Sequence, residues 1–119
     1  MRFYTSYFGN VGNIGDDVVK ISISLWSPRT WHGWKMRSLA PSEDILREYK
    51  QNGDVDRYIE RYCEEILRNK DCAKMVEDLG NKFGGRDICF LCYESKGKFC
   101  QRNLVSTWLR DNGYPCREW

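Results

Sequence analysis

A nearly continuous apolar run from Ile88 to Tyr93 constrains the fold more than any other segment of this chain. A strand covered on one face only would alternate apolar with polar residues, whereas this run is apolar at almost every position. Such a run is typical of a central strand in a parallel sheet, which is buried on both faces. Parallel neighbours need long crossover connections, so helices should alternate with strands along the chain.

The rest of the sequence supplies this alternation. Apolar and polar residues alternate from Val19 to Trp26, which predicts a strand over 18–26. Ser42 and Asp54 each precede a helical pattern and are the residue types that cap helix N-termini. The other predicted elements are a strand at 3–8, a long aromatic and basic loop at 27–41, a helix at 72–82, a turn at 95–98, a helix carrying Leu104 to Leu109, and a short strand at 114–119.

Length and composition fix the class of protein. With 119 residues, we expect a single domain over 1–119, with a Rossmann-like, mostly parallel sheet flanked by helices. The net charge of +2 gives no field that would by itself favour duplex DNA. No apolar run approaches the roughly 20 residues that span a bilayer, and the N-terminus has no apolar signal region, so we expect a cytoplasmic protein. The six cysteines are therefore expected to be reduced.

Three predicted strands end at the same edge of the sheet, where open α/β folds bind their ligands. Their last residues are Thr5-Ser6-Tyr7, Ser24-Leu25-Trp26 and Cys92-Tyr93-Glu94. The N-terminus of the final helix lies close by, so its free backbone N–H groups should face the same crevice. Arg102, in the first turn of that helix, opposes the helix dipole, which favours a role in binding an anion.

Two side chains in this region are candidates for chemistry. Glu94 follows an apolar strand, and partial burial there would suit a general acid or base; the alternative is that it pairs with Arg102 across the turn. Cys100 lies beside Arg102 at a helix N-terminus, an environment that favours a reactive thiolate; the alternative is that it packs as a small apolar residue. Cys89 and Cys92 are three apart on a strand and should face opposite sides, so we expect no metal site there, and no cofactor.

Aromatic and basic residues are interleaved around the second strand and the loop after it. Trp26, Trp31 and Tyr7 offer stacking surfaces, and Arg29 offers positive charge, a combination that suits a nucleotide or a single-stranded nucleic acid. The alternative is a loop that folds its tryptophans onto the core as a lid. For Trp26 itself we expect partial burial.

The segment Leu91-Cys92-Tyr93-Glu94, followed by Phe99-Cys100-Gln101-Arg102 and an amphipathic helix, resembles the domain-of-unknown-function 488 family. Members of that family typically show L-C-x-E followed by C-H-R. Further stretches, among them Tyr4 to Phe8 and Glu118-Trp119, are similar to small members found in prokaryotes and phages. The resemblance implies a compact Rossmann-like domain without a known reaction. Gln101 replaces the histidine of the motif and cannot titrate, so a proton-carrying or metal-binding role of that position does not transfer.

Three hypotheses about function follow. The first is that a nucleotide-like or other phosphate-bearing ligand binds at the carboxyl edge, with N-glycosidic or hydrolytic chemistry at Glu94 as an option. The second is a non-catalytic interaction protein, such as a phage-type inhibitor that sequesters a host protein. The third is thiol chemistry at Cys100. The expected ligand-binding residues are Thr5, Ser6, Tyr7, Ser24, Trp26, Arg29, Trp31, Cys92, Tyr93, Gln101 and Arg102.

Overall fold

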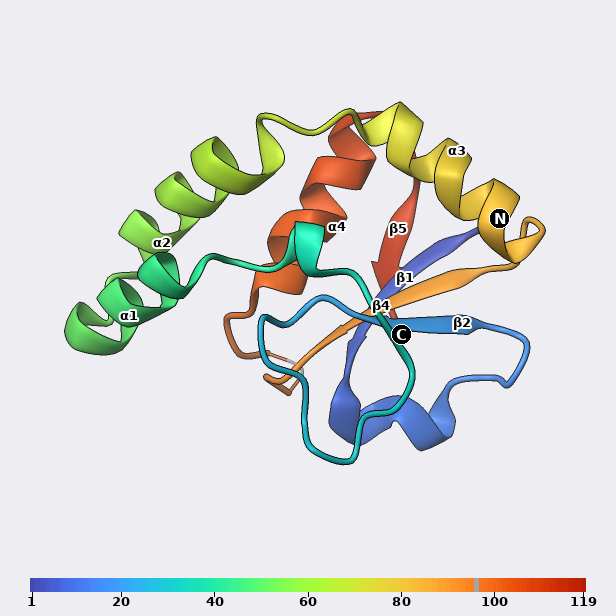
Figure 1. The fold of residues 1–119 in the computed structure, drawn as a ribbon, viewed down its shortest axis with the longest axis horizontal. Coiled ribbons are helices and arrows are strands. Elements are labelled where there is room, and N and C mark those ends of the chain that lie inside the picture. The colour runs from blue at the N-terminus through green and yellow to red at the C-terminus, as the bar shows by residue number, and fades with distance from the viewer. Residues whose placement is uncertain (96) are drawn as a thin grey trace.

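Strand β4, Ile88–Cys92, lies in the middle of a five-stranded parallel sheet in the computed structural model (Figure 1). The structure describes residues 1–95 and 97–119, so Lys96, within the expected turn at 95–98, lies outside the described residues. All five β4 residues are buried, which confirms the central strand expected from the apolar run. The strand order is β3-β2-β4-β1-β5, with β1 at Phe3–Tyr7, β2 at Val19–Ser22, β3 at Trp34–Lys35 and β5 at Cys116–Glu118.

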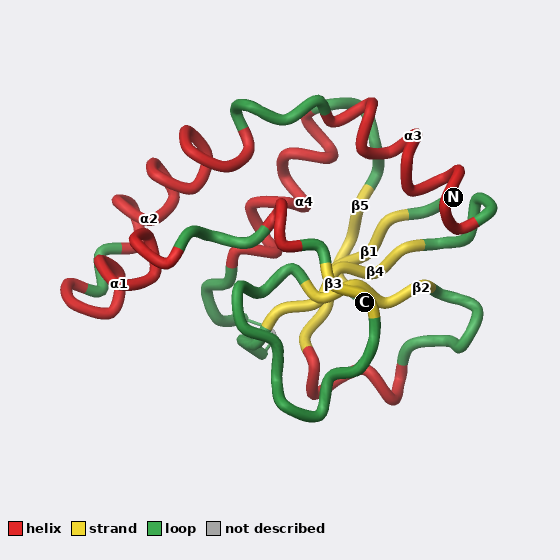
Figure 2. Tube along the Cα trace, viewed as in Figure 1, coloured by secondary structure: helices red, strands yellow, loops and turns green. Residues whose placement is uncertain are grey.

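The two faces of the sheet are covered differently. Helices α3, Cys72–Phe83, and α4, Gln101–Asp111, lie over one face, where Phe90 and Cys92 join the larger core cluster. A 3-10 helix, Phe8–Asn13, and the loop before β3 lie on the opposite side (Figure 2). There Cys89 packs in a second, smaller cluster. Cys89 and Cys92 therefore face opposite sides of β4, as their spacing predicted.

Helices α1, Glu43–Asn52, and α2, Val55–Tyr62, lie side by side and extend away from the sheet (Figure 1). Ser42 caps α1 by accepting a hydrogen bond from the backbone of Ile45, and Asp54 caps α2 in the same way, so both predicted caps are confirmed. A left-handed glycine, Gly53 at φ 64°, makes the turn between the helices. The chain continues from α2 into a π-helix, Cys63–Leu67.

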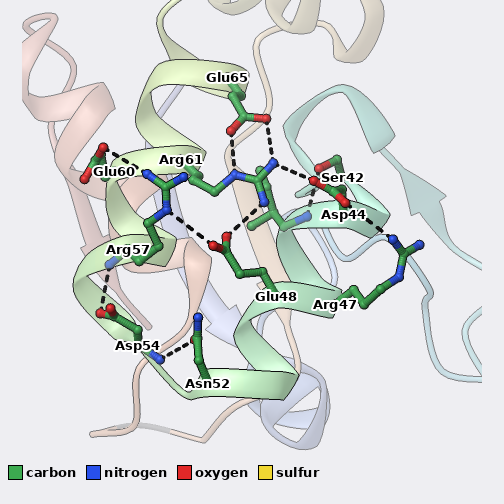
Figure 3. Close-up of polar contacts among 11 residues, drawn as sticks. Ser42, Asp44, Arg47, Glu48, Asn52, Asp54, Arg57, Glu60, Arg61 and Glu65 are labelled. Atoms are coloured by element: carbon green, nitrogen blue, oxygen red, sulfur yellow. Dashed lines mark hydrogen bonds and ion pairs between the residues drawn. The ribbon is translucent and has the colours of Figure 1, made fainter.

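A network of ion pairs holds this helical hairpin together (Figure 3). The Arg61 guanidinium on α2 contacts two carboxylates of α1, Asp44 at 2.8 Å and Glu48 at 2.9 Å, and Glu65 of the following π-helix at 2.7 Å. Hydrogen bonds from Arg61 hold the pKa values of the Asp44 and Glu48 carboxyls below their usual range. The network therefore fixes where α1 stands beside α2.

Two expectations about local structure were wrong. The second strand ends at Ser22 instead of Trp26, because the chain bends there and the Ser22 and Ser27 hydroxyls form a 2.8 Å hydrogen bond. Residues 27–41 are not one long loop, since they contain β3 and a 3-10 helix, Arg37–Leu39. No helix in the described part of the chain is both long and apolar enough to cross a membrane.

The expectation of fully reduced cysteines was also wrong for one pair. Cys92 and Cys100 form a disulfide, because the end of β4 and the start of α4 bring the two sulfurs together. The other four cysteines, all of them among the described residues, are free thiols.

Candidate functional site

An open groove lies at the carboxyl ends of β2 and β4. It consists of two adjoining cavities, of about 550 and about 390 Å³. We call it the carboxyl-edge groove and define it by the residues that line both cavities: Ser24, Leu46, Tyr49, Tyr93, Glu94 and Gln101. The edge of the sheet that the sequence indicated thus carries a cavity large enough for a small molecule.

Ser24 and Gln101 line the inner part of the groove, and both are only 7% exposed. The Gln101 side chain donates a hydrogen bond to the backbone carbonyl of Ile23, which ties the start of α4 to the end of β2. The Ser24 hydroxyl is buried and has no hydrogen-bond partner among the residues that the structure describes. Because buried hydroxyls are nearly always paired, this one is a candidate to bond a ligand or an ordered water.

Tyr93, Trp26 and Glu94 line the outer part. Tyr93 and Trp26 are both 51% exposed, and the Tyr93 hydroxyl donates a 2.6 Å hydrogen bond to the Trp26 carbonyl. Trp26 lines the larger cavity. Glu94 is exposed, so the partial burial expected for it is absent, because it lies two residues beyond the end of β4. Glu94 therefore lines both cavities as an exposed residue.

Helices α1 and α2 form a wall that the sequence reasoning missed. Leu46, Tyr49 and Lys50 of α1 reach the larger cavity, and Tyr58 of α2 reaches the smaller one. The Tyr58 ring lies 5.3 Å from that of Tyr49, and its burial raises the pKa of its hydroxyl, which stays neutral. No local signal in the sequence showed that residues of α1 and α2 would line this groove.

Arg102 lies beneath the groove and not in it. The side chain is 1% exposed and forms a bidentate ion pair with Glu118 of β5, with distances of 2.9 to 3.2 Å. Its Nη1 atom also donates to the Cys92 sulfur at 3.2 Å and to the Glu94 carbonyl at 2.5 Å. The expected alternative of an ion pair with the Glu94 carboxylate is therefore wrong, since Glu118 supplies the carboxylate. The charge of Arg102 is compensated inside the protein.

Other predicted site residues lie around the ion pair of Arg102 and Glu118. The Thr5 hydroxyl donates to Glu118 at 2.8 Å, and the Tyr7 ring lies 5.7 Å from the Arg102 guanidinium. Ser6 is fully buried and accepts a 3.1 Å hydrogen bond from the Asn10 side chain. These strand-end residues hold the edge of the sheet together beneath the groove.

Two predicted residues lie elsewhere. The Trp31 ring packs against Phe8 at 5.4 Å, its Nε1 donates to the Trp34 carbonyl at 3.0 Å, and it lines a separate cavity of about 490 Å³. Arg29 is exposed in the same loop. The loop therefore folds Trp31 onto the second face of the sheet. Of the two alternatives for this residue, packing onto the core is the one that the structure shows.

Cys100 connects the groove to the disulfide. It is the N-cap residue of α4, is 7% exposed and lines the smaller cavity. Cys92, its partner, is 1% exposed at the end of β4. Cys100 thus lines the smaller cavity, while the Cys92 sulfur lies next to the Arg102 guanidinium.

Comparison with known families agrees with the sequence motifs. A family model described as the active DUF488-N3 subclade, DUF488-N3a, matches residues 14–113. The chain belongs to the DUF488 family. In this DUF488 domain the match covers every residue that defines the groove and ends before Glu118, the partner of Arg102. No curated protein and no solved structure matches the chain.

Proposed function

We propose that this DUF488 domain binds a nucleotide-like or other phosphate-bearing ligand in the carboxyl-edge groove. The observation that carries the proposal is the unpaired, buried hydroxyl of Ser24, a residue that lines an open cavity of about 550 Å³ bordered by exposed aromatic residues. A polar ligand that bonded this hydroxyl would remove the cost of burying it unpaired, about 1–3 kcal/mol.

The aromatic residues support a flat ring as part of the ligand. Trp26 and Tyr93 are half exposed, and the hydrogen bond from the Tyr93 hydroxyl to the Trp26 backbone carbonyl positions the Tyr93 ring as a surface on which a base could stack. Stacking of a base on an aromatic side chain contributes about 1–3 kcal/mol. A stacked base beside Ser24 would leave the sugar near the Glu94 carboxylate, which can accept hydrogen bonds from hydroxyl groups.

Positive charge for a phosphate would come from groups other than Arg102. The first turn of α4 has free backbone N–H groups, and no side-chain cap is found for it among the described residues. Lys50 lines the larger cavity and Lys98 the smaller one. In this proposal Arg102 is a positioning residue that holds the Glu94 backbone at the groove.

Catalysis is a separate part of the proposal. The matching subclade is described as active, which supports testing hydrolytic or N-glycosidic chemistry at Glu94. Since Gln101 cannot titrate, Glu94 is the carboxylic acid among the residues that define the groove.

Isothermal titration with adenosine monophosphate, adenosine and inorganic phosphate tests the proposal. We expect the monophosphate to bind most tightly, and Trp26→Ala to weaken it by about 5- to 150-fold, the equivalent of one lost stacking contact. Trp34→Ala is the matched control, because Trp34 is equally exposed, at 51%, but packs on Phe83. Equal effects of the two variants, or no binding of any of the three compounds, would count against the proposal. Glu94→Gln should weaken adenosine binding without changing phosphate binding.

A further inference from the structure

We propose that the Cys92–Cys100 bridge is a redox-active disulfide, which a dithiol reductant opens by entering the carboxyl-edge groove and attacking Cys100. The exchange reaction itself does not require a bound nucleotide. The bridge joins the two ends of the loop that carries Tyr93 and Glu94, so its redox state governs how firmly these residues are held at the groove.

The surroundings of the two sulfurs differ in a way that selects the point of attack. Cys100 lines the smaller cavity of the groove, whereas Cys92 is 1% exposed at the end of β4. Thiol–disulfide exchange depends on which sulfur can be reached and on how well the other sulfur leaves as a thiolate. Access therefore favours attack at Cys100 and departure of Cys92.

Arg102 is placed to stabilise the departing thiolate. Its Nη1 atom lies 3.2 Å from the Cys92 sulfur, and a guanidinium beside a thiolate favours the charged form. The ion pair with Glu118 and the bond to the Glu94 carbonyl keep the guanidinium in this position. The Cys100 sulfur, in turn, lies at the N-terminus of α4, where the helix dipole favours a thiolate.

The reaction consists of two exchanges. In the first, a thiolate of the reductant forms a bond to the Cys100 sulfur, the Cys92–Cys100 bond breaks, and its electron pair passes to Cys92. In the second, the other thiolate of the reductant attacks the reductant sulfur that is bonded to Cys100. The mixed disulfide breaks, and Cys100 leaves as a thiolate. Two electrons and two protons pass from the reductant to the protein, and the reductant becomes a disulfide.

Alkylation followed by mass spectrometry tests the bridge itself. When the untreated protein is unfolded without reductant, four of the six cysteines should be labelled. After the native protein has been incubated with dithiothreitol and then unfolded for labelling, all six cysteines should be labelled. Labelling of six without reductant would overturn the proposal, and so would reduction of the native protein that is no faster than its global unfolding.

Two serine variants test the direction of attack. The folded Cys92→Ser and Cys100→Ser proteins are treated with an aromatic disulfide reagent, and the labelled sites are mapped by peptide mass spectrometry with Cys63 as the internal reference. We expect Cys100, in the first variant, to react on the order of tenfold faster than Cys92 in the second. Equal rates, or faster reaction at Cys92, would overturn the proposed direction.

A variant of Arg102 tests the stabilisation of the leaving group. Arg102→Gln should slow the reduction of the native bridge by on the order of tenfold, the effect of one lost charge-assisted contact. Arg110→Gln, on the same helix, is the control and should leave the rate unchanged. An unchanged rate of reduction in Arg102→Gln would show that Arg102 does not stabilise the departing Cys92 thiolate. Should that variant not fold, the two serine variants still decide between the sulfurs.

Discussion

Replacing Glu118 by Gln tests whether Arg102 is a structural anchor. The substitution keeps the shape of the side chain and an acceptor oxygen but removes the negative charge that faces the guanidinium. Arg102 is 1% exposed, so its charge would remain buried without an ionic partner. Removing one member of a fully buried ion pair costs about 3–5 kcal/mol. Because the Glu118 side chain is 22% exposed, solvent screens part of this loss, and we expect about 2–3 kcal/mol.

Urea denaturation followed by circular dichroism gives this value, with the midpoint and the slope fitted together. Asp78→Asn is the matched control, because the Lys74–Asp78 pair has the same 2.9 Å separation as Arg102 and Glu118 but both its side chains are at least 60% exposed. The control should leave the midpoint within experimental error. If Glu118→Gln shifted the midpoint no more than Asp78→Asn does, the reasoning that the buried pair anchors this edge of the sheet would be refuted.

Three further predictions concern stability and reactivity. Arg61 lowers the pKa values of Asp44 and Glu48 below their ordinary 3.8 and 4.5, so the stabilisation by Arg61 is present above pH 4.5 and is lost as the pH falls through the lowered values. The difference in unfolding free energy between wild type and Arg61→Gln should therefore shrink in acid. A difference that stays constant from pH 7 to pH 2 would contradict this. Gly53→Ala should cost about 1 kcal/mol in urea denaturation, because Gly53 has φ 64°, and an unchanged midpoint would show that the turn relaxes. Burial raises the pKa of Cys89 to about 12, so native alkylation at pH 7 should leave this thiol unlabelled, and rapid labelling would show that the second face of the sheet opens.

Local patterns in the sequence predicted much of the fold. The apolar run identified the central strand, and the caps at Ser42 and Asp54 identified two helix starts, because both signals depend on residues close in the chain. The end of β2 was predicted too late, since the alternation continues beyond Ser22 while the backbone bends. The resemblance to the DUF488 family was confirmed by the match over residues 14–113.

The partners within the site could not be predicted in the same way. Glu118 reaches Arg102 because β5 pairs with β1 in a register that places Glu118 opposite Thr5, a contact between residues 113 apart in sequence. The α1 wall depends on how the helical hairpin packs through Tyr58 and Phe99, whose rings lie 5.1 Å apart. Nothing in the neighbouring sequence determines these long-range contacts. The sequence therefore predicted the edge of the sheet where the groove lies, but it assigned anion binding to Arg102, whose charge is already paired with Glu118.

Mapping of backbone amide chemical shifts by NMR during titration with adenosine monophosphate tests the central claim most directly. We predict that the largest changes occur at Ser24, Trp26 and Glu94, on adjoining sides of the carboxyl-edge groove, and in the first turn of α4. Largest changes in the loop around Trp31 and Trp34 would contradict the account, because those residues lie outside the groove, and so would a titration that moves no amide.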